Sequence, residues 1–160
     1  MHLHAALVTA ALALSTLQAE PLRAQSTPDR AAVDRVAVER AALDYLEGFY
    51  EGDSTKHTRS IRPEVFKYGF SRARATGQYS GSQMTWPEFH EFTRQVRTSG
   101  RVRPAGTVKE VQLFEVLDQT AAAKVTAYWG VDYLLLAKFD GRWMITHVLW
   151  QTPPVVAPSP

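Results

Sequence analysis

The chain has 160 residues, of which 45% are hydrophobic and 21% are charged, and it contains no cysteine. This composition is that of an ordinary globular protein, and it excludes collagen-like, coiled-coil and disordered chains. The length suits one domain, because two halves would be too small to bury enough apolar surface. A net charge of +2 argues against nucleic acid as a partner. Without cysteine, disulfides and thiolate metal sites are excluded, and we expect no metal and no cofactor.

The amino terminus has the pattern of a secretory signal peptide. Its apolar run from Ala5 to Leu17 is too short to span a bilayer but has the length of a signal h-region. We predict that residues 1–25 form this signal, with cleavage after Ala19 or Ala24, and that the mature protein is periplasmic or secreted without stable membrane insertion. The alternative is a buried amino-terminal helix. Residues 26–152 then form the domain, and the proline-rich residues 153–160 form a disordered tail.

Three helices are predicted in the first two thirds of the chain. A long helix starts at Thr27, the N-cap before a proline, and ends at Gly52. Asp53 can cap a short second helix that carries His57. A third helix runs over residues 85–97, with its apolar residues at helical spacing.

The segment between the second and third helices has no clear period. Pro63, Gly69, Gly77 and Gly81 interrupt it, and we interpret it as loop with short pieces of strand. Its Gly-rich end lacks the lysine of a phosphate-binding loop. Residues 56–103 are rich in Lys and Arg, which we interpret as exposed side chains; an anionic ligand or an acidic membrane surface is the alternative.

Four strands are predicted after Thr107, within residues 107–117, 122–129, 131–139 and 142–151. The pair Asp140-Gly141 favours a two-residue turn with positive φ at both positions, so the last two strands form a hairpin. Helices followed by antiparallel strands indicate an α+β fold in which the helices cover one face of a bent sheet.

The hairpin turn predicts the strand register, and the register predicts the two faces. It pairs Leu136 with Ile145 and Leu134 with His147, and it puts Asp132 on the same face as His147. An acid and an imidazole on an apolar face are costly unless they pair or face a wet cavity. We therefore propose Asp132 and His147 as a candidate catalytic pair, with a structural ion pair as the alternative.

The opposite face of the hairpin is also apolar, although a small α+β domain covers only one face with its own helices. We expect a homodimer through this outer face. The residues assigned to the contact are Tyr133, Leu135, Val148 and Trp150.

The hairpin residues 129–145, which run from Trp129-Gly130-Val131-Asp132 to Trp143-Met144-Ile145, closely resemble the carboxyl-terminal hairpin of the putative lumazine-binding family. The helix end at residues 44–53 and Met84-Thr85 are similar to that family as well. The family belongs to the nuclear transport factor 2-like superfamily, together with SnoaL-like proteins. The resemblance covers roughly residues 30–151 and implies a cone-shaped fold with a concave pocket, commonly in a dimer.

The pocket implied by this resemblance is expected to bind a small, flat, apolar or heteroaromatic ligand. The residues assigned to it are Tyr45, Phe49, His57, Tyr68, Trp129, Leu134 and Trp143, although aromatic residues of a small domain are more often core. A binder without catalysis is the first hypothesis. An isomerase, dehydratase or cyclase that uses Asp132 or His147 as general base is the second, and a dimeric interaction module is the third.

No histidine has the spacing of a metal site. His90 lies in a sequence that resembles a zinc protease helix, but Arg94 stands where the second histidine ligand is needed.

Overall fold

The computed structural model describes residues 27–154. In chain order its elements are α1 (Thr27–Glu51), α2 (Ser54–Ser60), β1 (Ile61–Arg72), β2 (Tyr79–Met84), α3 (Trp86–Thr98), β3 (Lys109–Val116), β4 (Thr120–Ala127), β5 (Gly130–Phe139) and β6 (Arg142–Gln151). The predicted signal peptide and most of the predicted tail lie outside the described residues. None of the described helices is both long and apolar enough to cross a membrane.

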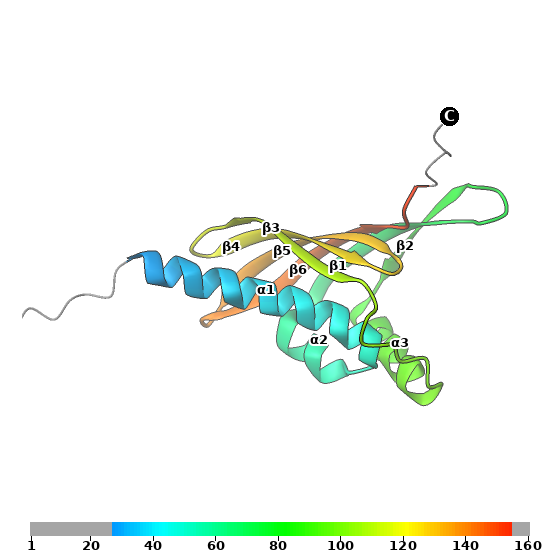
Figure 1. Ribbon diagram of the computed structural model, residues 1–160, viewed down its shortest axis with the longest axis horizontal. Helices are drawn as coiled ribbons and strands as arrows, with labels where there is room; N and C mark the ends of the chain where they lie inside the picture. Colours follow the sequence, from blue (N-terminus) through cyan, green and yellow to red (C-terminus); the bar gives the residue numbers. More distant parts are fainter. Residues whose placement is uncertain (1–26, 155–160) are drawn as a thin grey trace, which may run out of the picture.

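Six strands form one sheet in the order β2-β1-β6-β5-β4-β3. Only β1 and β6 pair in parallel, and the other neighbours are antiparallel. All three helices lie on the same side of the sheet, with α1 along its length and α2 and α3 near one end (Figure 1). The predicted α+β fold, with helices on one face of a curved sheet, is confirmed.

The local signals for the helix ends behave as predicted. Gly52 ends α1 with a positive φ of 66°, which favours glycine. Asp53 caps α2 by accepting a hydrogen bond from the backbone N–H of Thr55 at 2.9 Å. Thr85 donates both its backbone N–H and its hydroxyl to the Glu88 carboxylate at the start of α3.

The segment interpreted as loop is in fact two strands, and that prediction was wrong. β1 is twelve residues long and is stabilised by parallel pairing with β6 and antiparallel pairing with β2. Its sequence lacks a strand signal because both of its faces carry apolar residues and because Gly69 interrupts the pattern. Gly69 fits here since the Trp150 ring covers it: a Cβ at position 69 would lie 2.1 Å from Cδ1 of that ring.

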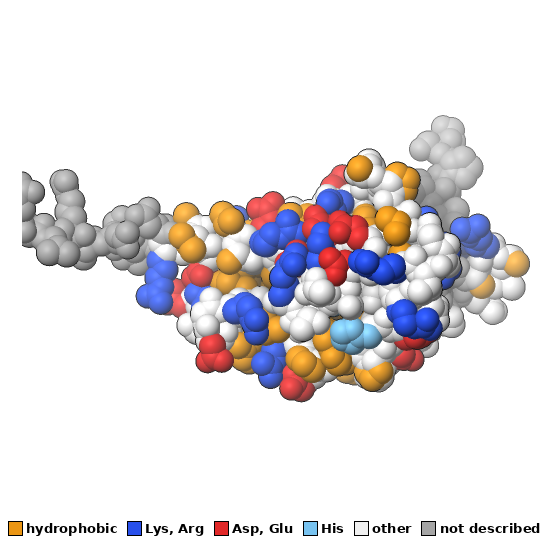
Figure 2. All heavy atoms as spheres, turned by 90° about the horizontal axis from the view of Figure 1, so that it is seen from below, with side chains coloured by type: hydrophobic (Ala, Val, Ile, Leu, Met, Phe, Trp, Pro, Cys, Tyr) orange, Lys and Arg blue, Asp and Glu red, His pale blue; other side chains and the backbone are white. Residues whose placement is uncertain are grey.

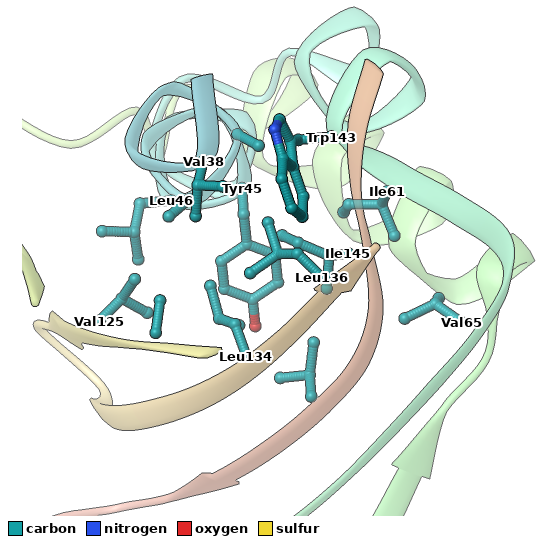
Figure 3. Packing of buried hydrophobic residues seen from close by; sticks show 14 of the residues in the cluster. Val38, Tyr45, Leu46, Ile61, Val65, Val125, Leu134, Leu136, Trp143 and Ile145 are labelled. Carbon is teal, nitrogen blue, oxygen red and sulfur yellow. The ribbon is translucent and has the colours of Figure 1, made fainter. Parts of the chain in front are cut away.

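The core lies between α1 and the covered face of the sheet. Figure 3 shows Val38, Tyr45 and Leu46 of α1 facing Leu134, Leu136 and Ile145 of β5 and β6. All six side chains are buried, with at most 2% exposed. This packing holds the ring of Tyr45 over β5, which places its hydroxyl at the sheet.

The helical side of the molecule carries a network of ion pairs. Figure 2 shows Lys and Arg side chains beside Asp and Glu over the helices. At its centre, Glu47 of α1 accepts from Lys56 of α2 at 2.8 Å and from Lys109 of β3 at 2.7 Å. Although burial raises the pKa of Glu47, these hydrogen bonds and the neighbouring positive charges bring the pKa down to about 2. The network ties α1, α2 and the sheet edge together.

The hairpin turn is as predicted, but the register changes within the hairpin. Asp140 and Gly141 both have positive φ, and Leu136 pairs with Ile145. A bulge follows, so that His147 pairs with Leu135 and not with Leu134. Beyond this bulge every β6 side chain lies on the face opposite to the predicted one.

Candidate functional site: a buried lysine at a cavity

Three polar side chains from three elements meet beneath the covered face of the sheet. Lys67 of β1 donates from Nζ to the hydroxyl of Tyr45 on α1 at 2.5 Å. That hydroxyl in turn donates to Oδ2 of Asp132 on β5. The lysine Nζ lies 3.6 Å from the same carboxylate oxygen, so the three groups form one hydrogen-bonded cluster.

The cluster is almost completely removed from water. Lys67 is 5% exposed, whereas Tyr45 and Asp132 are fully buried. The second oxygen of Asp132, Oδ1, accepts a hydrogen bond from the indole N–H of Trp129 at 2.7 Å. Both carboxylate oxygens therefore have partners, as a charge in a dry site requires.

Aromatic rings surround the ammonium group of Lys67. Its Nζ lies 4.7 Å from the centre of the Phe49 ring, 5.4 Å from that of Phe89 and 6.0 Å from that of Trp150. Such rings attract a cation through their electron-rich faces. Together with Tyr45, whose ring centre lies at 4.9 Å, they form what we call the aromatic box.

Burial and charge act on the pKa values of the cluster in opposite ways. Burial lowers the pKa of Lys67, while the charge of Asp132 and its hydrogen bonding oppose this effect. Burial raises the pKa of Tyr45 well above its ordinary value, and the neighbouring Asp132 charge raises it further. Tyr45 therefore stays a neutral hydroxyl that can both accept and donate.

A cavity of about 450 Å³ opens beside Lys67. Its apolar wall is formed by α1, α3, the β1–β2 hairpin and the ends of β4 to β6, and its polar residues come from α3 and β2. The residues that line it are Phe49, Lys67, Ser82, Gln83, Met84, Glu88, Glu91, Phe92, Gln95, Tyr128, Trp129 and Trp150. A largely apolar cavity with a buried ammonium group among its lining residues has the form of a small-molecule site.

Three of the residues predicted to bind the ligand lie at this site, together with Asp132 of the predicted catalytic pair. Phe49 and Trp129 line the cavity, and Tyr45 and Asp132 lie beneath Lys67. Asp132 does not line the cavity, so it acts on a ligand only through its neighbours. Ligand binding by these residues stays a prediction.

Three other predicted pocket residues lie elsewhere. Leu134 is a core residue under α1, and Trp143 lies in the core, where its indole N–H donates to Asp34 at 3.0 Å. Tyr68 alternates with Lys67 along β1 and therefore faces the opposite side of the sheet, where its ring stacks with that of Phe66. In each case the side chain lies away from the cavity because of its packing against neighbouring residues, which the composition of the chain does not reveal.

His57 is buried beside the cluster, not at the mouth of the pocket. Its Nε2 lies 3.0 Å from the backbone oxygen of Tyr45, and its ring centre is 4.4 Å from that of Phe49. Nδ1 has no hydrogen-bond partner within the described residues. Burial lowers the pKa of His57 to about 4, and the charge of Lys67 adds to this effect, so the ring is neutral at physiological pH.

The predicted pairing of Asp132 with His147 was wrong. The bulge in β6 puts His147 on the exposed face, opposite the exposed Leu135, while Asp132 points into the core. The same shift moves two residues of the predicted dimer contact. Val148 is buried in the core, and Trp150 lines the cavity.

The sequence offered little indication of Lys67. It lies in the basic stretch that we interpreted as exposed, between two aromatic residues that would ordinarily be taken as the buried ones. The one available signal is alternation: if Phe66 and Tyr68 share the outer face, residue 67 must face inward.

The described residues contain no cluster of three or more His, Cys, Asp or Glu side chains suited to a metal ion.

The sequence matches the family described as "Putative lumazine-binding" over residues 33–151. The search among curated proteins gave no match.

Several solved structures share the fold. A protein of unknown function from Shewanella baltica that is described as similar to nuclear transport factor 2 superimposes with a TM-score of 0.54 at 15% identity, covering 77% of this chain and 96% of its own. Another protein described as similar to nuclear transport factor 2, with a cystatin-like fold and from Novosphingobium aromaticivorans, gives a TM-score of 0.56 at 10% identity, covering 81% of this chain and 88% of its own. The association domain of Caenorhabditis elegans CaMKII gives a TM-score of 0.52 at 12% identity, covering 78% of this chain and 99% of its own. At these identities the similarity shows the fold alone.

Proposed function

Because the chain belongs to the putative lumazine-binding family, and because its cavity ends at a buried ammonium group, we propose that it binds a small, flat, largely apolar molecule with a hydrogen-bond acceptor. The single observation that carries this proposal is the position of Lys67, whose Nζ donates to Tyr45 and whose side chain lines the cavity. An ammonium has three N–H donors. Tyr45 takes one of them and the Asp132 carboxylate lies 3.6 Å away, beyond hydrogen-bonding distance, which leaves a donor for a ligand.

The walls of the cavity match a flat ring system. Trp129 and Trp150 line it together with Phe49 and Phe92, and flat ligands gain from stacking against such rings. Asp132 fixes the orientation of the site without touching the ligand, because it holds Trp129 and Tyr45 by hydrogen bonds.

A pair of ligands of equal shape tests the proposal. Lumazine is a flat bicyclic heteroaromatic with carbonyl acceptors, and naphthalene is a flat bicyclic hydrocarbon without acceptors. Because Trp129 and Trp150 lie in the cavity wall, binding is measured by quenching of tryptophan fluorescence. One hydrogen bond from Lys67 is worth about 1.4 kcal/mol, so lumazine should bind about tenfold more tightly than naphthalene.

The variant Lys67→Met keeps the length and apolar character of the side chain and removes the donor. It should bring the two affinities together, whereas Lys124→Met, at a position outside the cavity, should leave them apart. Absence of quenching by both ligands in the unmodified protein would refute the proposal.

We also propose that the outer face of the sheet associates with a second copy of the chain. The large apolar side chains of this face are exposed, with Tyr133 at 51% and Leu135 at 52%, and Phe66, Phe70, Phe114 and Leu149 are exposed as well. No described helix covers this face (Figure 1). An exposed apolar patch of this kind marks an interaction site, and a two-fold contact of like with like is the commonest arrangement.

The similarity in fold to a domain described as the association domain of CaMKII supports this second proposal. The test is the molar mass in solution, measured by light scattering after size exclusion over a range of concentrations. Leu135→Lys should give the monomer mass. Leu117→Lys, at a loop position that is 54% exposed, is the matched control and should leave the mass of the dimer unchanged. A monomer mass for the unmodified protein at every concentration would exclude this contact.

Export of the protein is a further proposal, supported by the apolar run that ends at Leu17. Expression of the full chain in a bacterium, followed by fractionation, should place it outside the cytoplasm. Its intact mass should correspond to a chain that begins at Glu20 or Gln25. Recovery of the full-length mass from the cytoplasm would contradict this proposal.

A further inference from the structure

Lys67 differs from the other described lysines in how it meets its carboxylate. Lys56, Lys109 and Lys138 each form a direct ion pair with an acid, with N–O distances of 2.6 to 2.8 Å. The Nζ of Lys67 is 3.6 Å from Asp132, and the closest oxygen to it is the hydroxyl of Tyr45. The amine and its acid are thus joined through a phenol.

This arrangement lets the lysine lose its proton without exposing a charge. Tyr45 accepts from Lys67 and donates to Asp132. If the hydroxyl passes its own proton to Asp132 and takes one from Lys67, the ammonium becomes a neutral amine and the carboxylate a neutral acid. The pair of Lys67 and Asp132 has no net charge either before or after this exchange. The low polarity of the surroundings therefore does not oppose it, whereas it would oppose a proton transfer that left one unpaired charge in the site. Lys67 can therefore present a free electron pair to the cavity.

We propose that Lys67 binds carbonyl compounds covalently, by forming an imine with a flat aromatic aldehyde held in the cavity. This inference rests on the proposed function, since the aldehyde must first occupy the proposed ligand site. It adds to that function a chemical class of ligand and a covalent bond.

The reaction balances with groups that are present at the site. The neutral amine of Lys67 attacks the carbonyl carbon to form a C–N bond, and one of the two protons on the nitrogen moves to the oxygen to give a carbinolamine. The nitrogen lone pair then expels the hydroxyl group, which leaves as water with the second of these protons, and a C=N bond remains. Overall, one aldehyde and one amine give one imine and one water, and the proton stored on Asp132 returns through Tyr45 to the imine nitrogen.

The aromatic box favours this product. A protonated imine keeps a positive charge on Nζ, and the rings of Phe49, Phe89 and Trp150 surround this atom at 4.7 to 6.0 Å. Asp132 becomes its counterion again once the proton has returned. The protonated imine thus replaces the Lys67 ammonium with the same charge at the same place. In addition, the aromatic ring of the aldehyde stacks against the rings of the cavity.

The depressed pKa of Lys67 acts in the same direction, because it increases the fraction of free amine. Each unit by which the pKa falls multiplies that fraction by about ten at neutral pH. A desolvated lysine in an apolar pocket is a recognised way to obtain a nucleophilic amine.

Trapping with a reductant tests the inference. The protein is incubated with 2-naphthaldehyde and sodium cyanoborohydride, which reduces an iminium to a stable secondary amine, and the modified peptides are identified by mass spectrometry. Lys67 should acquire one naphthylmethyl group at least about tenfold faster than Lys56, Lys109, Lys124 or Lys138. The variant Tyr45→Phe, which removes the hydroxyl between amine and acid, should slow the labelling of Lys67 and leave the labelling of the other lysines unchanged.

A second readout separates this inference from the proposed function. 2-Naphthalenemethanol has the same shape but no carbonyl, and its binding is followed by quenching of tryptophan fluorescence. If it binds while Lys67 reacts no faster than Lys56, Lys109, Lys124 and Lys138, the cavity is a ligand site and the imine is refuted. If it does not bind and Lys67 is not labelled, both the ligand site and the imine are refuted.

Discussion

The variant Asp132→Asn tests whether the buried cluster is held together by charge. It removes the negative charge and keeps the size of the side chain. The carboxylate accepts from the hydroxyl of Tyr45 and from the indole N–H of Trp129, and the ammonium of Lys67 lies 3.6 Å from it. The amide would turn its own N–H₂ group toward one of them, and the ammonium would be left without a counterion at a site where Lys67 is 5% exposed.

Removing one partner of a buried ion pair costs about 3–5 kcal/mol, because the remaining charge stays desolvated. Both members of this pair are buried, so solvent screening does not reduce the figure. A slope of about 2 kcal/mol per molar urea is ordinary for a domain of this size, and the unfolding midpoint should therefore fall by about 2 M. Chemical unfolding followed by circular dichroism measures it.

The double variant Asp132→Asn with Lys67→Met provides the control. Once the ammonium is gone, the amide no longer faces an unpaired charge, so the double variant should be more stable than Asp132→Asn alone. The coupling between the two sites should be about 1.5–3 kcal/mol. A midpoint for Asp132→Asn within about 0.5 M of the unmodified protein, or additive effects of the two substitutions, would refute this account of the cluster.

Three further predictions concern the surroundings of the site. His57 has a pKa of about 4 in the fold and of 6.5 when unfolded, so its contribution to the unfolding free energy should be full above pH 6.5 and fall by about 3 kcal/mol as the pH drops to 4. Below pH 4 this contribution should stay constant, and further loss of stability comes from acids such as Glu47 that titrate lower. The variant His147→Gln, at an exposed histidine, should leave this pH dependence of the unfolding free energy unchanged. Gly48→Ala should destabilise the fold by at least about 1 kcal/mol in urea unfolding, since the new methyl would lie 2.2 Å from Cδ2 of His57, and wild-type stability of this variant would contradict the packing. Gly69→Ala should displace the Trp150 ring and weaken lumazine binding, and an unchanged tryptophan emission spectrum would show that the ring has not moved.

The elements that were predicted correctly are those with local signals. Gly52, the N-cap Asp53 and the Asp140-Gly141 turn act through neighbours a few residues away, so the sequence alone identifies them. The last two predicted strands end at the same residues as β5 and β6, and their starts agree to within one residue. The interior of the same hairpin was not predictable, because the bulge at Thr146 has no Gly or Pro to mark it.

The error in the hairpin had consequences because strand faces alternate. One extra residue between Ile145 and His147 moved His147, Val148 and Trp150 together. Asp132 was assigned to the correct face of the sheet because it lies on β5, whereas the extra residue lies on β6. The position of the acid was therefore predictable from the pattern, whereas its partners were fixed by packing between elements far apart in the chain: Tyr45 on α1 and Lys67 on β1.

The inward position of Lys67 depends on what its neighbours do on the other side of the sheet. Phe66 and Phe70 are exposed at 50% and 39%, and Lys67 lies between them on the covered face, the reverse of the usual distribution of apolar and charged residues. In a single copy, β1 would bury more apolar surface if its faces were exchanged, with Phe66 and Phe70 toward the helices and Lys67 toward solvent. In the proposed dimer the outer aromatic residues become buried, which offsets the cost of the enclosed ammonium. Dimerisation and the ligand site should therefore be linked, and Leu135→Lys, although it touches only the outer face, should weaken lumazine binding as it releases the monomer.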